Sequence, residues 1–495
     1  MIDELESLDE LGAELVRAAH SAGVALIWRA QSRTTSSALV RGGRTESSST
    51  TSVTGHGIQV VTDGGATALG SRDDLRPDPA RELLGRVIRV AGASPGLGLH
   101  RGGRWSLEPV QDRRVPAGLA AFHRVDLHAV CRRLAELEST IGGRVPGVGL
   151  RLHYRAELDA WRVMRSDGTD VLFAMPRCVL TARATGEGPD SRHGVGVSVF
   201  HSRPELLWRE RETDLFLRSA EKAARLARDL PDAPPHPAGS FPLIIDFALA
   251  KGLAHEAFGH ASEADGFRSS ILASDGRFRC QERVGADHVS IIDEPLEGDH
   301  AWQPYSANGV LRSRAVLVRN GRLEDGLSDP WSAEPGGVRL TGAARAESFH
   351  HAPQPRMSNI RIQVRDPLPA PGKFEEYGPE QVRDLLQGAG LFERHPRWAF
   401  LSGYAGGQVN TASGDFAFQC KAIYRLDRDG VSLCKPAIFS GSMLDALESV
   451  REAFGPLRLD AIGHCGKWGQ SVPSSGGSHY FLAFDPHPAV RIGGR

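Results

Sequence analysis

Apolar and polar residues recur at different periods along the chain and so predict its helices and strands. Residues 3–22 repeat Leu, Val and Ala at helical spacing, whereas residues 24–70 are rich in Val, Thr and Ser between Gly-Gly turns, a pattern typical of antiparallel strands. Residues 147–200 return to a strand pattern. Helical spacing recurs near 78–92, 122–138 and 203–229, with a Gly- and Pro-rich connection between the first two. We therefore expect an N-terminal α/β domain over residues 1–230.

Five prolines then interrupt the chain between residues 231 and 242, which marks this stretch as the predicted domain boundary. Residues 241–266 begin as an apolar strand and continue with helical spacing. Residues 285–350 have the pattern of short strands and hairpins, with Asn320-Gly321 at a turn.

The remainder of the chain completes the second predicted domain. Helices are expected near 379–388 and 443–453, between strand-like segments. The tail from residue 461 is rich in Gly, Ser and Pro, and we expect ordered loops there because its aromatic residues need burial. The predicted fold class is therefore α+β, with a β-rich C-terminal domain over residues 231–495.

Composition narrows the classes of function. The 495 residues carry a formal net charge of −1, so neither a basic nucleic-acid-binding surface nor a charged tail is expected. No apolar run reaches the length of a membrane span, and the acidic start MIDELESLDELG lacks the features of a secretory signal. We expect a cytoplasmic protein with no membrane or nucleic-acid partner. Its six cysteines include no C-x-x-C pair, so no disulfide framework is expected in that reducing compartment.

One short segment carries candidate metal chemistry. In the run His255-Glu256-Ala257-Phe258-Gly259-His260, two imidazoles bracket a carboxylate. Imidazole nitrogens are common zinc ligands, and a glutamate beside them can act as the general base that deprotonates a metal-bound water. The alternative interpretation is two unrelated histidines on a surface helix. The segment is therefore a candidate hydrolytic metal site.

The two histidines lie five residues apart, one more than in the H-E-x-x-H zinc motif. On a regular α-helix this spacing separates the side chains by about 140°, which is too far for one small ion. In a π-helical turn of roughly 4.4 residues, the same spacing returns to within about 50°. The spacing therefore predicts a widened turn or a break within residues 255–260, with Gly259 easing the distortion.

Three further blocks follow this motif along the chain. The motif itself extends to Glu263 and Asp265, and the later blocks are Pro355-Arg356-Met357-Ser358-Asn359, then Gly406-Gly407-Gln408-Val409 with Ser413-Gly414 and Phe416, and finally Cys465-Gly466-Lys467 with Gly469-Gln470 and Val472-Pro473. Together these blocks resemble the TldD/PmbA family of zinc-dependent peptidases, specifically its TldD-like branch. The resemblance covers nearly the whole chain.

The resemblance implies a third zinc ligand in the last block, where Cys465 occupies the matching position. A thiolate beside two imidazoles suits Zn²⁺ and leaves a fourth position open. The alternatives are an inert thiol at Cys465, and its neighbour His464 as the ligand. Glu256 is the candidate general base, and the alternative for it is a carboxylate on the helix surface.

Residues around the predicted ligands have candidate supporting roles. Glu263 and Asp265 are expected either to accept a hydrogen bond from a ligand imidazole, or to cap the helix or pair with Arg268. Arg356 is expected either to grip a substrate carboxylate or carbonyl, or to form a structural salt bridge. The later glycines would let an extended substrate approach as an added strand, at Gly406, Gly407 and Gly466.

The resemblance implies zinc-dependent hydrolysis of peptide bonds in unfolded or extended peptides. It also implies a dimer, either a homodimer or a heterodimer with a PmbA-like (TldE) subunit. Two alternatives stay open: hydrolysis of a small amide in a biosynthetic pathway, and a non-catalytic partner subunit. Trp468 and the stretch 365–400 depart from the family pattern and would suit a reshaped pocket. The intact His-Glu-His and Cys set argues against a non-catalytic subunit.

Overall fold

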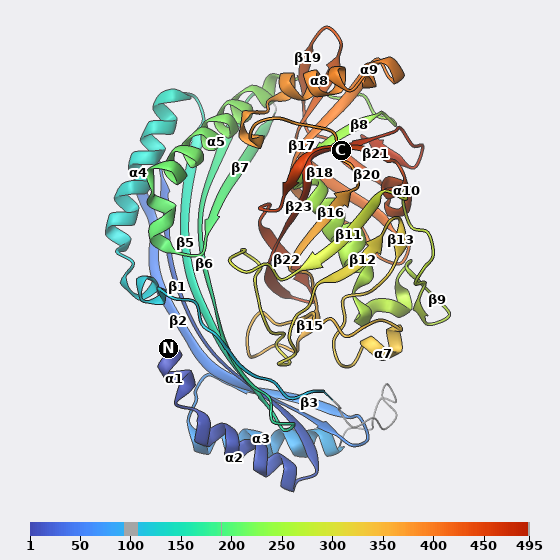
Figure 1. The fold of residues 1–495 in the computed structure, drawn as a ribbon. Helices are drawn as coiled ribbons and strands as arrows, with labels where there is room; N and C mark the ends of the chain where they lie inside the picture. Colours follow the sequence, from blue (N-terminus) through green and yellow to red (C-terminus); the bar gives the residue numbers. More distant parts are fainter. Residues whose placement is uncertain (94–106, 190, 494–495) are drawn as a thin grey trace.

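Two large sheets, one in each half of the chain, face each other across the molecule (Figure 1). The structure is a computed structural model that describes residues 1–93, 107–189 and 191–493. Part of the predicted Gly- and Pro-rich connection before residue 122 therefore lies outside the described residues. The fold class is α+β, as the sequence predicts.

Long antiparallel strands build the N-terminal sheet. β1 (Val24–Arg41) pairs with both β2 (Arg44–Thr62) and β5 (Gly149–Arg165), and the predicted meander over 24–70 is confirmed. The strand order is β3-β2-β1-β5-β6-β4, with β7 paired to β6. The other strands of this sheet are β3 (Thr67–Arg72), β4 (Gln111–Arg114), β6 (Asp170–Glu187) and β7 (Arg192–His201).

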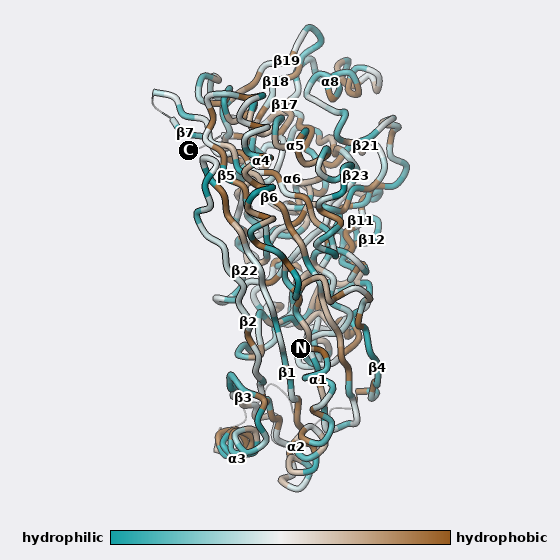
Figure 2. Tube along the Cα trace, turned by 90° about the vertical axis from the view of Figure 1, so that its left-hand side faces the viewer, coloured by the Kyte–Doolittle hydropathy of each residue, from teal (hydrophilic) through white to brown (hydrophobic). Residues whose placement is uncertain are grey.

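Helices cover the outer face of this sheet (Figure 1). They are α1 (Ile2–Glu6), α2 (Asp9–Ser21), α3 (Pro77–Ala93), α4 (Leu127–Arg144) and α5 (Glu210–Asp229), so the first predicted helix is in fact two. Trp28, Ala30 and Ala38 alternate along β1 and are buried in one core with these helices, as the two-residue period of a strand requires. Figure 2 views the molecule from this side, with the long strands running down its length.

The opposite face of β1 is polar and turns toward the C-terminal half. Arg29 Nη2 donates a hydrogen bond to Asn308 Oδ1 at 2.7 Å, and Arg33 Nη1 donates to the carbonyl oxygen of Glu347 at 3.2 Å. Buried polar groups need such partners. The two halves are therefore joined by specific hydrogen bonds as well as by apolar packing.

Among the described residues the C-terminal sheet has 13 strands. Most follow the order β13-β12-β11-β16-β23-β8-β17-β18-β20-β24, whereas β19 pairs with β18, and β21 and β22 pair with β23. The strands that position the candidate site are β8 (Leu243–Asp246), β16 (Asn359–Val364), β17 (Arg397–Asn410), β22 (Gly463–Lys467) and β23 (Gln470–Phe484). The others are β11 (Val289–Glu294), β12 (Ala315–Arg319), β13 (Arg322–Leu323), β18 (Asp415–Asp427), β19 (Val431–Cys434), β20 (Ile438–Ser442), β21 (Val450–Arg458) and β24 (Val490–Ile492).

Short elements complete the chain. Two small sheets pair β9 (Ala273–Ser274) with β10 (Arg277–Phe278) and β14 (Ala344–Arg345) with β15 (Gln354–Pro355). The remaining α-helices are α6 (Phe247–Gly252), α7 (Ala333–Gly336), α8 (Pro379–Gly388), α9 (Leu391–Arg394) and α10 (Met443–Glu448), and short 3-10 segments are η1 (Leu119–Arg124), η2 (Pro204–Trp208), η3 (Leu230–Asp232), η5 (His260–Ser262), η6 (Ala264–Ser269) and η7 (Phe374–Glu376). None of the described helices is both long enough and apolar enough to cross a membrane.

We propose that the two domains meet between residues 231 and 242. Within the described part of the chain, the N-terminal sheet takes no strand after β7, and the C-terminal sheet takes none before β8. The stretch 365–400 belongs to the second domain, because α8 and α9 pack with Phe400 and Phe481 in a small hydrophobic cluster of their own.

Two sequence-based expectations for the C-terminal half are wrong. The predicted helix over 443–453 ends at Glu448, because the chain from Val450 pairs with β23 as β21. The tail from 461 forms strands rather than loops. A Cβ atom at Gly476 would lie 1.8 Å from the Ile360 carbonyl oxygen, so glycine marks the close approach of neighbouring strands here instead of a loop.

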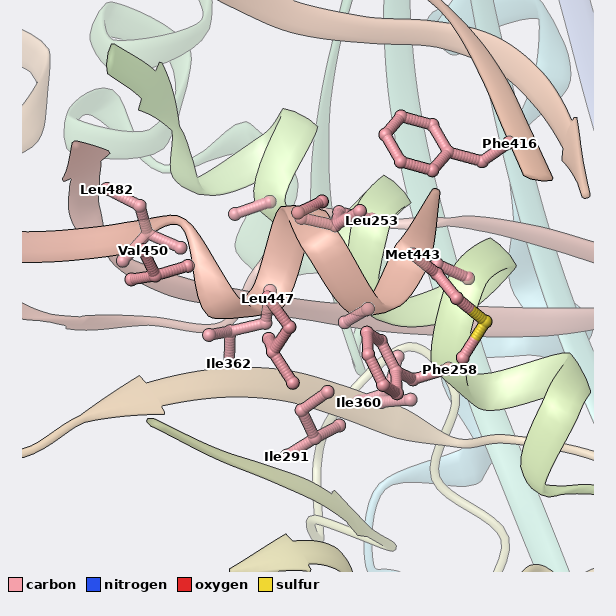
Figure 3. Packing of buried hydrophobic residues seen from close by; sticks show 14 of the residues in the cluster. Leu253, Phe258, Ile291, Ile360, Ile362, Phe416, Met443, Leu447, Val450 and Leu482 are labelled. Carbon is pink, nitrogen blue, oxygen red and sulfur yellow. The ribbon is translucent and has the colours of Figure 1, made fainter. Parts of the chain in front are cut away.

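A large apolar core supports the segment that carries the histidine motif. Phe258 and Leu253 extend into it beside Ile360, Met443 and Leu447 (Figure 3). All five side chains are buried. Because one face of the segment is held in a close-packed core, the segment cannot rotate. The directions of His255 and His260 are therefore fixed as well.

Candidate metal centre

The helical segment that carries the motif begins directly after β8. Asp246, the last residue of β8, accepts a hydrogen bond from Leu249 N at 2.9 Å and so caps α6 (Phe247–Gly252). A π-helical turn follows over Leu253–Gly259, and a short 3-10 turn covers His260–Ser262. The widened turn that the histidine spacing predicts is therefore confirmed.

Gly259 contributes through its size and not through an unusual backbone conformation. Its φ is −58°, an ordinary helical value. A Cβ atom at this position would lie 1.9 Å from Met357 Sδ. Glycine is therefore needed because Met357 packs directly against the turn, which differs from the sequence-based expectation that Gly259 eases a distortion.

The π-helical turn brings the two imidazoles together, and β22 brings the thiol. One potential ligand atom from each of His255, His260 and Cys465 lies within 4.8 Å of the others. The two ring centroids are 5.2 Å apart with the ring planes at 89°. Cys465 Sγ lies 3.6 Å from His260 Nε2, although the two residues are 205 positions apart in the chain.

The chemistry of these three residues fits a zinc ion. His255 is 1% exposed, and neither of its ring nitrogens has a hydrogen-bond partner among the described residues. Burying a ring nitrogen without a hydrogen-bond partner costs free energy. A bound metal ion would supply the missing partner for one of these nitrogens. Two imidazole nitrogens and one thiolate are a donor set that suits zinc and leaves a fourth position open.

The surroundings of His255 keep its imidazole in the neutral form that binds metals. Burial lowers the pKa of His255 well below its ordinary value, and the nearby Lys251 ammonium lowers it further. Lys251 lies one helical turn before His255, and its Nζ donates to Ser474 Oγ at 3.0 Å. Lys251 was not predicted from the sequence. Its position four residues before His255 places it on the same side of a helix, but it belongs to none of the motifs.

Glu263 orients the second imidazole. Its Oε2 accepts a hydrogen bond from His260 Nδ1 at 3.1 Å, which leaves Nε2 facing Cys465. Burial lowers the pKa of His260, but the Glu263 carboxylate and the Cys465 sulfur outweigh this effect and raise the pKa well above its ordinary value. Carboxylates commonly orient metal-binding imidazoles in this way, so the geometry favours the orienting role over a helix cap.

Among the described residues, Asp265 forms no ion pair or side-chain hydrogen bond with either imidazole or with Arg268. Its carboxylate binds Lys467 Nζ at 2.7 Å, and Lys467 Nζ also lies 2.9 Å from Glu263 Oε2. Lys467 is on β22, two residues after Cys465. These ion pairs therefore connect the strand that carries the thiol to the segment that follows the histidines.

Arg356 lies against Cys465. Its Nε donates to Cys465 Sγ at 3.2 Å, and its Nη2 donates to the carbonyl oxygen of the same residue. The side chain is fully buried, and only Nη1 lacks a partner in the described part of the chain. A guanidinium is a strong donor to a thiolate, so these contacts favour a role in holding Cys465 over a grip on substrate or a salt bridge.

Glu256 lies beside the three potential ligands. Its Oε2 is 3.9 Å from His260 Nε2, and 18% of its side chain is exposed. Its Oε1 accepts a hydrogen bond from the Tyr404 hydroxyl at 3.0 Å. Sequence reasoning missed Tyr404, for which the only signal was its place two residues before the Gly406-Gly407 pair.

His464 turns away from this group. Its ring lies 5.8 Å from the ring of His300, and it lines a cavity of about 210 Å³ between the β22–β23 hairpin and the N-terminal sheet. Successive residues of a strand point to opposite faces, so only one of the neighbours His464 and Cys465 can face the histidines. The structure brings Cys465 to them.

The three glycines expected at a substrate surface differ from one another. Nothing lies within 4 Å of the position that a Cβ atom would take on Gly406 or Gly466. On Gly407 that atom would lie 2.3 Å from Phe418 Cδ1. Gly406 and Gly466 therefore leave open space, whereas Gly407 is required for packing within the sheet.

A family model covers the segment that forms this site. It is described as the PmbA/TldA metallopeptidase C-terminal domain and matches residues 238–474. A metalloprotease of Methanothermobacter thermautotrophicus is 28% identical over 461 residues, covering 91% of this chain and 92% of the relative. A metalloprotease TldD homolog of Haemophilus influenzae is 29% identical over 259 residues, covering 51% of this chain and 49% of the relative.

The fold is also found in a solved structure. The crystal structure of TldE from Thermococcus kodakarensis matches with a TM-score of 0.76 and 15% sequence identity, covering 98% of this chain and 100% of that one. At this identity the match concerns the fold alone. The family model and the named relatives therefore support the resemblance to the TldD/PmbA family that the sequence motifs indicate, and the solved structure shares the fold.

Proposed function

We propose that this chain is a zinc-dependent metallopeptidase that hydrolyses peptide bonds in unfolded or extended peptides. One observation carries the proposal: potential ligand atoms of His255, His260 and Cys465 lie within 4.8 Å of one another, with the Glu256 carboxylate beside them. The family resemblance supports it, because the relatives reported above are named metalloproteases.

His255 Nδ1 or Nε2, His260 Nε2 and Cys465 Sγ would hold the metal ion. A bound zinc ion would polarise the scissile carbonyl and lower the pKa of a water molecule. Glu256 accepts a proton from the attacking water and returns it to the leaving amine, since its Oε2 lies 3.9 Å from the potential ligand atom His260 Nε2. Glu263 and Arg356 keep His260 and Cys465 in place.

Two strand edges beside the site support an extended substrate. β17 pairs with β8 only over Ala399–Leu401, so from Ser402 onward β18 is its one partner among the described residues. β22 pairs only with β23 within the same part of the chain. Free backbone groups on such edges bind peptides as added strands, and the open positions at Gly406 and Gly466 lie on these two strands.

The proposed peptide substrate is preferred over a small amide. Trp468, which departs from the family pattern, is 79% exposed at the turn between β22 and β23. The stretch 365–400 packs in a separate cluster with Phe400 and Phe481. Neither feature narrows the surroundings of Glu256, so no specific observation favours the small-amide alternative.

The proposal extends to the assembly and location of the protein. We propose that it acts in the cytoplasm as a dimer, either with itself or with a PmbA-like (TldE) subunit. The complete donor set at His255, His260 and Cys465 supports a catalytic role for this chain within such a dimer, and not the role of a non-catalytic partner.

A substrate panel tests the proposal. The zinc-loaded protein would be incubated with an unstructured peptide, with a stably folded protein that contains the same segment, and with a series of small amides. Cleavage of the unstructured peptide alone is the expected result, read by mass spectrometry. Cleavage of small amides without peptide cleavage would favour the biosynthetic alternative, and no hydrolysis by a zinc-loaded chain would favour a non-catalytic subunit.

A further inference from the structure

Tyr404 on β17 contacts the candidate general base. Its hydroxyl donates a hydrogen bond to Glu256 Oε1 at 3.0 Å. The pairing of β17 with β18 shifts register between Tyr404 and Gly406. Such bulges re-aim side chains, and they are frequent beside active sites. The direction of Tyr404 is therefore set by a local feature of the strand.

The segment that carries the histidines has a space that fits the tyrosine ring. Gly252 lies one helical turn before Glu256, and a Cβ atom on Gly252 would be 2.5 Å from Tyr404 Cδ2. On another side the ring meets Phe418 edge-on, with 6.0 Å between the ring centroids. Any residue larger than glycine at position 252 would displace the ring and, with it, the hydroxyl.

One carboxylate also fixes β17 to the start of the same helical segment. Asp246 Oδ1 accepts the capping hydrogen bond from Leu249 N at 2.9 Å. Asp246 Oδ2 accepts hydrogen bonds from Gly403 N at 2.6 Å and from the Ser402 hydroxyl at 3.0 Å. Gly403 has a φ of +69°, a conformation that glycine adopts without strain. The residue before Tyr404 is thus tied to the helix that carries Glu256.

The two oxygens of Glu256 therefore have different surroundings. Oε1 is taken by the Tyr404 hydroxyl. Oε2 faces His260 Nε2 at 3.9 Å, on the side of the potential metal ligands. A carboxylate with one oxygen held in this way can rotate little. Its other oxygen therefore has a defined position, from which it can accept a proton from the attacking water.

We propose that Tyr404 is a positioning residue for the general base: it holds Glu256 Oε1 so that Oε2 alone is presented for proton transfer. The inference rests on the proposed hydrolytic function for its kinetic consequence, but the hydrogen bond itself can be tested without any measurement of activity. Tyr404 thus acts by orienting Glu256 and does not itself contact the substrate.

The kinetic test replaces Tyr404 by Phe, which keeps the ring in its place beside Gly252. The expected result is unchanged zinc content, a KM within about twofold of the parent and a kcat reduced roughly 10–100-fold, since general-base catalysis contributes about 10²–10⁴-fold and misplacement loses part of it. Tyr424→Phe is the matched control, because Tyr424 stacks on Phe400 in the separate cluster. It should change neither constant.

Three kinetic outcomes would overturn the proposal. An unchanged kcat would show that Glu256 does not depend on Tyr404. A raised KM with unchanged kcat would show that the tyrosine binds substrate instead. Loss of zinc from the Tyr404→Phe protein would show a role in building the metal centre.

A spectroscopic test needs neither metal nor activity. The chain has six tyrosines, and replacing them with 3-fluorotyrosine gives one ¹⁹F resonance each, with that of Tyr404 identified by its absence in Tyr404→Phe. Glu256→Ala, which removes the acceptor of the hydrogen bond, should shift the Tyr404 resonance and leave the other five in place. A resonance that does not respond would overturn the proposal, even if the protein hydrolysed peptides. A clear response in a protein that hydrolyses no peptide would support this inference while contradicting the proposed function.

Discussion

Each polar side chain at the metal centre is held by a specific neighbour. Glu263 holds His260, Arg356 holds Cys465, and Tyr404 holds Glu256. His255 is the exception, since both of its nitrogens lack a partner among the described residues. At the scale of single residues, Glu263, Arg356 and Tyr404 therefore support the site, whereas His255 offers a nitrogen that a metal ion could bind.

Replacing Glu256 by Gln should separate metal binding from chemistry. The amide oxygen can still accept the hydrogen bond from Tyr404, and the three potential ligands are untouched, so about one zinc ion per chain should remain. Hydrolysis should fall roughly 10²–10⁴-fold because the general base is lost. Elemental analysis and a peptide-cleavage assay on the same sample check both parts. Full activity in this variant would remove Glu256 from the proposed reaction.

Cys465 and its neighbour His464 offer a matched pair of substitutions. Cys465→Ser replaces a thiolate by a neutral hydroxyl, and zinc affinity should fall by more than roughly 100-fold, beyond the 10–100-fold typical of losing a supporting residue. His464→Ala should keep the affinity of the parent, since its ring faces His300. Competition with a chromogenic chelator measures both. The reverse pattern would assign the ligand role to His464.

Asp329 should make stability depend on pH. Burial raises the pKa of its carboxyl from the ordinary 3.8 to about 6, opposed by hydrogen bonds from Ser332. The folded state therefore keeps a proton that the unfolded chain has lost. The stabilising effect is full below about pH 4 and disappears as the pH rises through about 6.

The variant Asp329→Asn tests this dependence. Within the part of the chain that the structure describes, the hydrogen bonds to the carboxylate go to Oδ1, which the amide oxygen can replace. The free energy of unfolding of the variant should exceed that of the parent by about 1.5 kcal/mol near pH 5 and by about 3 kcal/mol at pH 8. Urea unfolding at the two pH values measures it. An equal change at both would show that Asp329 does not titrate as described.

At the scale of elements, the π-helical turn is the feature that makes the histidine spacing workable. It depends on Gly259, where a Cβ atom would meet Met357 Sδ at 1.9 Å. Gly259→Ala should lower the free energy of unfolding by about 1–3 kcal/mol, the usual cost of overpacking, and should weaken zinc binding. Gly266→Ala is the control, because nothing lies within 4 Å of a Cβ atom there. Equal stability of the two variants, measured by urea unfolding, would contradict this account of the turn.

The sequence predicted some elements well for identifiable reasons. The π-helical turn followed from arithmetic on the spacing of His255 and His260, which needs no knowledge of the fold. Cys465 lies 205 residues from His260, and only the family resemblance pointed to it. Tyr404 was missed because its direction depends on a register shift in β17, which no local pattern reveals.

The strand β23 was missed for a different reason. Its Gly and Ser residues suggest loops, yet they are small because other strands approach closely: a Cβ atom at Gly477 would lie 1.8 Å from the Arg458 carbonyl oxygen. Pattern-based prediction favours β-branched and aromatic residues in strands. It therefore fails where the packing of neighbouring backbones decides which residue fits.

At the scale of the whole molecule, the metal centre depends on segments from across the C-terminal half of the chain. β8 leads into the histidines, while β17 and β22 supply Tyr404 and Cys465. The N-terminal sheet lies opposite (Figure 1), and Arg177 and Arg345 line the cavity between the sheet and the β22–β23 hairpin. Residues from both halves of the chain therefore bound this cavity.

The most direct test is whether peptide cleavage follows zinc. The metal would be removed from the protein by chelation and returned in steps, while cleavage of an unstructured peptide is measured by mass spectrometry after each step. We predict that cleavage is absent without zinc, rises in proportion to it and saturates near one ion per chain, and that the Glu256→Gln protein stays inactive throughout. A chain that binds one zinc ion but cleaves no peptide, or cleavage that persists after zinc is removed, would contradict the account.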